Sequence, residues 1–165
     1  MVDLNSLNSF ISELSSNPYL VPFIISMLPV VELRLAIPYG VLVQKLEWTN
    51  VMLISSLGNY LAAILVFLFI KYLSEYFMKY KIFSLILDWI FKRTRKKGSR
   101  IEKYKLYGLI LFVGIPLPLT GAWTGCIASY LFNISVKNTL LGTFLGICMS
   151  ALIVTTLTLL GKLSF

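Results

Sequence analysis

The sequence predicts an all-α integral membrane protein, built as an inverted repeat in which each half holds a re-entrant helical hairpin followed by a transmembrane helix. Hydrophobic residues make up 58% of the 165 residues and charged residues only 13%, whereas soluble domains are roughly 45–50% apolar and about 25% charged. Two uncharged stretches have the length of a bilayer crossing, and two further apolar stretches are interrupted near their centres by prolines. A soluble protein of this size could not bury so much apolar side chain, because much of its surface stays in water. We therefore expect a single membrane domain over residues 1–165.

Two amphipathic segments are predicted to lie in the membrane interface. Over residues 1–17, Asp3 can cap a helix that carries one apolar face, formed by Leu4, Leu7, Ile11 and Leu14. Over residues 81–92, one narrow polar stripe runs along an otherwise apolar helix, and its members are Lys81, Ser84, Asp88 and Lys92. Helices of this kind lie in the headgroup region and do not cross the bilayer.

Residues 18–46 and 106–136 are each predicted to form a re-entrant hairpin that enters and leaves on one side of the membrane. The centre of the first is PVVELRLAIP (Pro29–Pro38), and the centre of the second is PLPLTG (Pro116–Gly121). Proline lacks an N–H donor and disfavours helix at the preceding residue, so the helix should break at both centres. The remaining arms are shorter than the roughly 20 residues that a crossing needs. Backbone exposed at a hairpin tip is tolerated only against protein or a wet cavity, so the two tips should pack together or line a cavity.

The two full crossings are predicted directly from length. Trp48–Ile70 holds 23 uncharged residues and Asn138–Gly161 holds 24, and about 20 apolar residues cover the hydrocarbon core. Gly58 and Gly146 lie inside these stretches, where a missing side chain lets a neighbouring helix approach closely.

The net charge of +8 lies entirely in the connector 71–105, which holds eleven basic and three acidic residues. Basic loops stay on the cytoplasmic side, so the connector should be cytoplasmic and both termini outside the cell membrane. The run KRTRKKGSR (Lys92–Arg100) is basic, yet we expect attraction to anionic lipid headgroups there and no nucleic-acid partner.

The order of hairpin, helix, hairpin, helix constitutes an internal repeat with an offset of 87–88 residues. Three identities follow it, in the pairs Pro29 and Pro116, Asn50 and Asn138, and Gly58 and Gly146. One crossing separates the two hairpins, so they should enter from opposite faces. Inverted repeats of this kind occur in secondary transporters, whose substrate site lies near the bilayer midplane.

Glu32 and Arg34 are the strongest candidates for a polar site, because a charge at bilayer depth costs at least about 2.5–3.5 kcal/mol on insertion scales. In an extended segment, their side chains would point the same way, whereas on a helix they would not face each other. They are either a structural ion pair bracing the hairpin, or charges on a tip that reaches shallow water, or an anion anchor (Arg34) beside a proton carrier (Glu32). Arginine stays charged and can bind phosphate with several donors.

The second tip offers different groups. A helix that starts near Gly121 would point free N–H groups at an anion, with Thr120 as its N-cap and Thr124 adding a hydroxyl. Trp123 would be either a packing residue or a wall on which a substrate stacks. Asn59, inside the first crossing, needs a partner, which is either a neighbouring helix or the substrate.

Several kinds of chemistry have no residues to support them. The chain has no His, so we expect no imidazole base, no metal site and no cofactor. Cys126 and Cys148 lack CxxC spacing and are predicted to be buried thiols. We expect no enzyme, since Glu32 alone could act as a general acid or base.

Two motifs carry a resemblance to a known family. PVVELRLAIPYG (Pro29–Gly40) and GLILFVGIPLPLTGAWTG (Gly108–Gly125) resemble the two signatures of the putative small multidrug export protein family, and the resemblance spans Pro18–Leu160. The layout more distantly resembles the DedA-like membrane proteins, whose paired acid and arginine residues are associated with moving polyprenyl-phosphate lipids. The likeness implies that Glu32 and Arg34 form the polar pair of the first hairpin. It also implies a second tip made of Pro116, Pro118, Thr120 and Gly121.

These observations together predict a small transporter or flippase for an amphipathic substrate, either a phosphate-bearing lipid or a drug-like molecule, with protons coupled through Glu32. The alternative is a membrane scaffold or assembly factor that transports nothing. The expected partners are membrane lipids, the substrate and a second copy of the chain, because so few crossings enclose only a narrow path.

Overall fold

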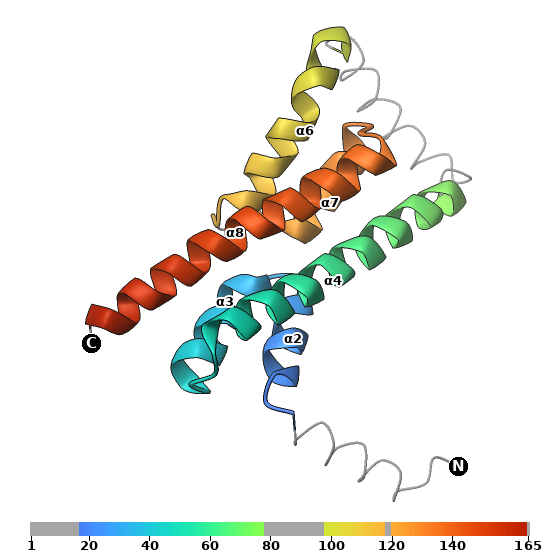
Figure 1. Cartoon of the computed structure of the whole chain (residues 1–165). Coiled ribbons are helices and arrows are strands. Elements are labelled where there is room, and N and C mark those ends of the chain that lie inside the picture. Colours follow the sequence, from blue (N-terminus) through green and yellow to red (C-terminus); the bar gives the residue numbers. More distant parts are fainter. Residues whose placement is uncertain (1–16, 78–97, 118–119, 165) are drawn as a thin grey trace, which may run out of the picture.

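The computed structural model describes residues 17–77, 98–117 and 120–164, which are mostly helical and contain no strand (Figure 1). In chain order the elements are α2 (Leu20–Met27), α3 (Glu32–Pro38), the π-helix η1 (Tyr39–Val43), α4 (Trp48–Phe77), α6 (Gly98–Gly114), α7 (Ala122–Leu131) and α8 (Val136–Ser164). The interfacial helix predicted over 1–17, apart from its last residue, and the one predicted over 81–92 lie outside the described residues.

Helices α4 and α8 are long and apolar enough to cross a membrane. Their candidate spans are Trp48–Tyr72 and Val136–Leu163, which include the predicted crossings over 48–70 and 138–161. The two helices pack against each other and run in opposite directions (Figure 1). The helical fold class and the positions of both long apolar helices are thus confirmed.

The surface and interior of these helices are arranged for lipid and not for water. Leu53 and Leu57 on α4 and Leu152 and Leu157 on α8 are each 60% to 62% exposed. The buried positions instead include small polar side chains, among them Ser55, Asn59, Thr139, Thr143 and Thr155. Lipid gives no hydrophobic driving force between helices, so the helices of membrane proteins associate through small residues and interhelical hydrogen bonds. The exposed leucines are suited to contact with acyl chains.

Two helical hairpins flank this pair of long helices (Figure 1). In the first, α2 packs against α3 and against α4, and α3 reaches across to α8. In the second, α6 packs against α7 and against α8, and α7 reaches across to α4. Each hairpin therefore lays its first arm on the long helix that follows it and contacts the other long helix with its second arm.

The two first arms lie against glycines at equivalent places. A Cβ added to Gly58 would lie 2.8 Å from the carbonyl oxygen of Phe23 on α2, and one added to Gly146 would lie 3.1 Å from that of Ile110 on α6. The predicted close approach at both glycines is confirmed. The four residues also follow the predicted offset of 87–88.

The break in the first hairpin is shorter than the sequence predicts. Helix α2 ends at Met27 and α3 already begins at Glu32, so the break covers residues 28–31, and Glu32 and Arg34 belong to a helix. Pro38 does not end the helix, because the backbone widens after it into the π-helix, where the Gln44 N–H binds the carbonyl of Tyr39 at 3.1 Å. The second hairpin does break over its predicted centre, between α6 and α7.

Candidate functional site

Glu32 opens helix α3 at the tip of the first hairpin, and its side chain is only 4% exposed. Its backbone has a φ of 49°, in the left-handed region that residues with a side chain rarely adopt. Such a conformation costs of order 1–3 kcal/mol and persists only where the surroundings fix it. The contacts around Glu32 therefore hold its backbone in this conformation.

The Glu32 carboxylate caps the N-terminus of α7 in the second hairpin. The Ala122 N–H donates to Oε2 and the Trp123 N–H donates to Oε1, each with an N···O distance of 3.3 Å. Nδ2 of Asn59 lies 3.5 Å from Oε2. The first N–H groups of a helix have no partner within it and carry a positive partial charge. The N–H groups that the sequence predicts to attract an anion at the second tip are thus bonded to the side chain of Glu32.

Gly121 makes this contact possible. Its φ is 152°, and a Cβ there would lie 2.5 Å and 2.6 Å from the two carboxylate oxygens of Glu32. Thr120 is not the N-cap, because Gly121 takes that position and the Glu32 carboxylate binds the first amides of α7. The Thr120 hydroxyl instead lies 3.0 Å from the Ile115 carbonyl and 2.9 Å from that of Leu117, so it closes the tip on itself.

Arg34 also reaches across to the second tip. Its Nη1 donates to the Leu117 carbonyl, and its Nη2 donates to the Thr120 hydroxyl at a distance of 3.2 Å. Its Nε is buried and has no partner in the described part of the chain. Glu32 and Arg34 also interact electrostatically with each other. Each of the two side chains bonds to the second tip, so together they hold one hairpin against the other.

A shallow cavity of about 380 Å³, wide open to the surface, lies beside Arg34. It lies between the first hairpin, the second tip and the last turns of α8, and it is lined by Arg34, Pro38, Leu42, Pro116, Val154, Leu157, Thr158 and Gly161. The walls are mostly apolar, and Arg34 is their charged member. A cavity of this composition suits a molecule with one anionic group and an apolar body.

The other predicted site residues lie around the same contact, with different partners. Asn59 binds Glu32, which makes it an interhelical hydrogen-bond donor, and its Oδ1 is buried without a partner in the described residues. Trp123 gives its backbone N–H to Glu32, while its buried indole N–H has no partner there either. The Thr124 hydroxyl bonds back to the Gly121 carbonyl at 3.3 Å. Pro118 lies outside the described residues.

Sequence reasoning missed the groups that complete the site. The Leu117 carbonyl binds Arg34, and Val154 and Thr158 supply one wall of the cavity. A backbone acceptor has no sequence signature, and the α8 residues look like ordinary membrane positions. Cys126 is buried as predicted, with Sγ 3.3 Å from the Ala63 carbonyl, whereas Cys148 is only partly buried, because it lies at the edge of a groove between α4 and α8.

The fold and the site together define a class of protein. Two long apolar helices with leucines outside and polar groups inside enclose a charged contact between two hairpin tips. Such an arrangement is that of a small integral membrane protein with an internal polar site.

The chain belongs to the family described as "putative small multi-drug export protein", whose family model matches residues 32–153. The matched stretch begins at Glu32, inside the first motif, and contains the whole second motif, so the family resemblance is confirmed over these residues. No curated protein and no solved structure matches the chain. The more distant likeness to the DedA-like proteins stays a prediction.

Proposed function

We propose that this protein is a small membrane transporter that moves an amphipathic substrate through the contact between its two hairpin tips. The observation that carries the proposal is the buried Glu32 carboxylate, which holds the N-terminus of α7 from the other half of the molecule. An ionisable side chain buried inside a membrane protein is by default a hypothesis for a functional site. Membership in a family described by drug export supports the same reading.

The proposed membrane arrangement is an inverted repeat with two re-entrant hairpins. The opposite directions of α4 and α8, the matching contacts of the two hairpins and the matched glycines Gly58 and Gly146 all support it. At 1.5 Å per residue, α2 is about 12 Å long and α7 about 15 Å, so neither arm spans roughly 30 Å of hydrocarbon. The basic connector 71–105 then lies in the cytoplasm, and both termini lie outside the cell membrane.

In this scheme, the substrate and protons compete with the hydrogen bonds that now join the two tips through Arg34 and Glu32. An anionic headgroup that enters the cavity competes with the Leu117 carbonyl and Thr120 for the guanidinium of Arg34. A proton on Glu32 removes the negative charge that the N-terminus of α7 attracts, which weakens the hold of the first tip on the second. Binding and protonation thus loosen the same contact.

Electrostatics favours an anionic amphipath as the substrate. Arg34 lines the cavity and would repel a lipophilic cation, whereas a phosphate accepts several guanidinium hydrogen bonds. The description of the family favours a drug-like molecule instead. We therefore take a phosphate-bearing lipid as the first choice and a lipophilic cation as the competing one.

The test is flux in liposomes that contain the full chain. Movement of a fluorescent phosphate-bearing lipid is compared with that of a lipophilic cation, for the wild type, for Arg34→Ala and for the control Lys137→Ala, whose side chain is exposed at the start of α8. Arg34→Ala should lower phosphate-lipid movement about tenfold or more, as expected for lost hydrogen bonds to a charged group, and Lys137→Ala should not. Unchanged movement in Arg34→Ala contradicts an anionic substrate.

A scaffold that transports nothing is the second candidate, and the tightness of the tip contact favours it. The Glu32 oxygens leave no room for even a methyl group on Gly121. If the contact is permanent, neither probe will move in the liposomes although Glu32→Gln still lowers stability. If it is a gate, acidification will change flux in the wild type and not in Glu32→Gln.

We further propose a dimer, which cross-linking of the wild type in native membranes tests.

A further inference from the structure

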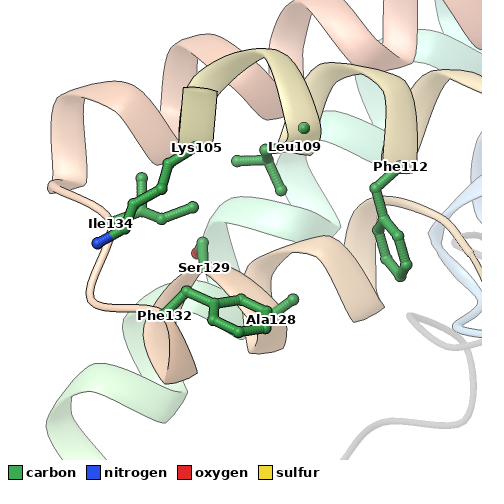
Figure 2. Close-up of a pocket in the computed structure, with 8 residues that line it drawn as sticks. Lys105, Leu109, Phe112, Ala128, Ser129, Phe132 and Ile134 are labelled. Carbon is green, nitrogen blue, oxygen red and sulfur yellow. The ribbon is translucent and has the colours of Figure 1, made fainter. Parts of the chain in front are cut away.

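A second groove lies away from the Arg34 cavity, between α6 and α7. Its volume is about 350 Å³, and none of its lining residues lines the Arg34 cavity. The residues that line it are Lys105, Gly108, Leu109, Phe112, Ala128, Ser129, Phe132 and Ile134 (Figure 2). The groove therefore belongs to the second hairpin alone and plays no part in the contact between the tips.

The groove is apolar along its length and charged at one end. Lys105 lies with Ile134 at one end, and Phe112 lies at the other (Figure 2), about 10 Å further along α6 at 1.5 Å per residue. The other polar side chain in the lining is Ser129, whose hydroxyl already donates to the Cys126 carbonyl over 2.8 Å. The walls thus offer an occupant one positive charge and otherwise apolar contact.

Gly108 keeps the wall of α6 open. A Cβ added there would meet no atom within 4 Å, in contrast to Gly114, Gly142 and Gly146 on the helices nearby, where it would come within 3.0 Å of a side chain. The space beside Gly108 is therefore not needed for packing between helices.

We propose that this groove binds one anionic phospholipid, with an acyl chain along the apolar walls and the phosphate on Lys105. Charge complementarity selects the occupant, because Lys105 ends the connector 71–105, which carries the whole net charge of +8. Anionic headgroups gain about 1 kcal/mol per basic side chain near the membrane surface. Long apolar walls that end in one ammonium group match a lipid with a single phosphate.

The experiment measures lipid retention by the purified full-length protein in detergent, using native mass spectrometry with phosphatidylglycerol and phosphatidylcholine as probes. The wild type should retain one phosphatidylglycerol in preference to phosphatidylcholine. Lys105→Gln should reduce that preference about fivefold. Gly108→Phe, or Gly108→Leu if the larger side chain prevents folding, should remove the bound lipid by filling the groove without changing any charge.

Two controls separate the groove from general attraction to the basic connector. Lys137→Gln removes an exposed charge at the start of α8, and Leu111→Phe adds a ring on an exposed face of α6 outside the groove. Both should retain lipid as the wild type does. Equal retention of the two lipids by the wild type overturns the proposal, and so does retention that Gly108→Phe leaves unchanged. A switch from dimer to monomer in Gly108→Phe, with lipid still bound, assigns the groove to a second copy of the chain and also overturns it.

Discussion

Glu32 is the side chain on which the two halves of the molecule meet. A buried carboxylate is costly unless it is hydrogen-bonded, and here the amides of Ala122 and Trp123 and the side chain of Asn59 surround it. The backbone at Glu32 is strained as well, with a φ of 49°. A change at this position should therefore affect stability and transport together.

Replacing Glu32 by glutamine should destabilise the protein by about 1–3 kcal/mol, because a charged acceptor at a helix N-terminus becomes a neutral amide with one acceptor fewer. Thermal unfolding of the detergent-solubilised chain measures this. Glu47→Gln is the matched control, since Glu47 is exposed and, within the described residues, its carboxylate accepts hydrogen bonds from its neighbours Thr49 and Asn50. Equal effects of the two variants would show that the carboxylate at the tip has no special role.

Gly121→Ala tests the same contact from the other side. The added methyl group collides with the Glu32 oxygens, and the backbone at φ 152° disfavours any side chain, so we expect a loss of about 2–4 kcal/mol. In a Glu32→Ala background the collision disappears and only the backbone cost remains. The loss on Gly121→Ala should then fall by at least about 1 kcal/mol in the double-mutant cycle. Simple additivity would mean that the two residues do not meet.

At the scale of elements, each hairpin is fixed by a close approach to a glycine. Phe23 on α2 approaches Gly58, and Val113 on α6 approaches Gly146, whose added Cβ would lie 2.6 Å from the Cβ of Val113. Helices in lipid are held together by such packing, because there is no hydrophobic drive between them. These two contacts set where the hairpin arms lie on the long helices.

Gly58→Ala and Gly146→Ala should each cost about 1–3 kcal/mol, because the methyl group pushes the packed arm away from its long helix. Gly108→Ala is the control on α6, where open space and better helix propensity should give a gain of about 0.5–1 kcal/mol. Unfolding temperatures of the three variants in detergent decide this. Similar values for all three would contradict the proposed role of the contacts.

The sequence predicts the long elements better than the tips. The apolar spans of α4 and α8 lie close to the stretches that charge spacing predicts, since a crossing has a fixed length, although α4 itself continues past Lys71 to Phe77. The first tip differs from its prediction because the π-helix after Pro38 accommodates a proline that was expected to break the helix. The cap on α7 could not be predicted either. Two residues ninety positions apart in the chain meet there, and only Gly121 hints at the contact.

At the scale of the whole molecule, the proposed inverted repeat requires two halves of opposite orientation joined at their tips. Helix α4 begins where α8 ends, and α8 begins at the far end of α4 (Figure 1). The exposed lysines Lys45 and Lys162 flank one end of this pair, and the exposed Lys137 marks the other. These three positions therefore report on both ends of the helix pair at once.

Labelling with a membrane-impermeant maleimide tests this arrangement most directly. In a chain with Cys126→Ala and Cys148→Ala, single cysteines at Lys45→Cys, Lys162→Cys and Lys137→Cys are probed in intact cells. If the inverted repeat is correct, Lys45→Cys and Lys162→Cys will react from outside, and Lys137→Cys will react only after the cells are opened. Reaction of Lys45→Cys and Lys137→Cys from the same side would contradict it.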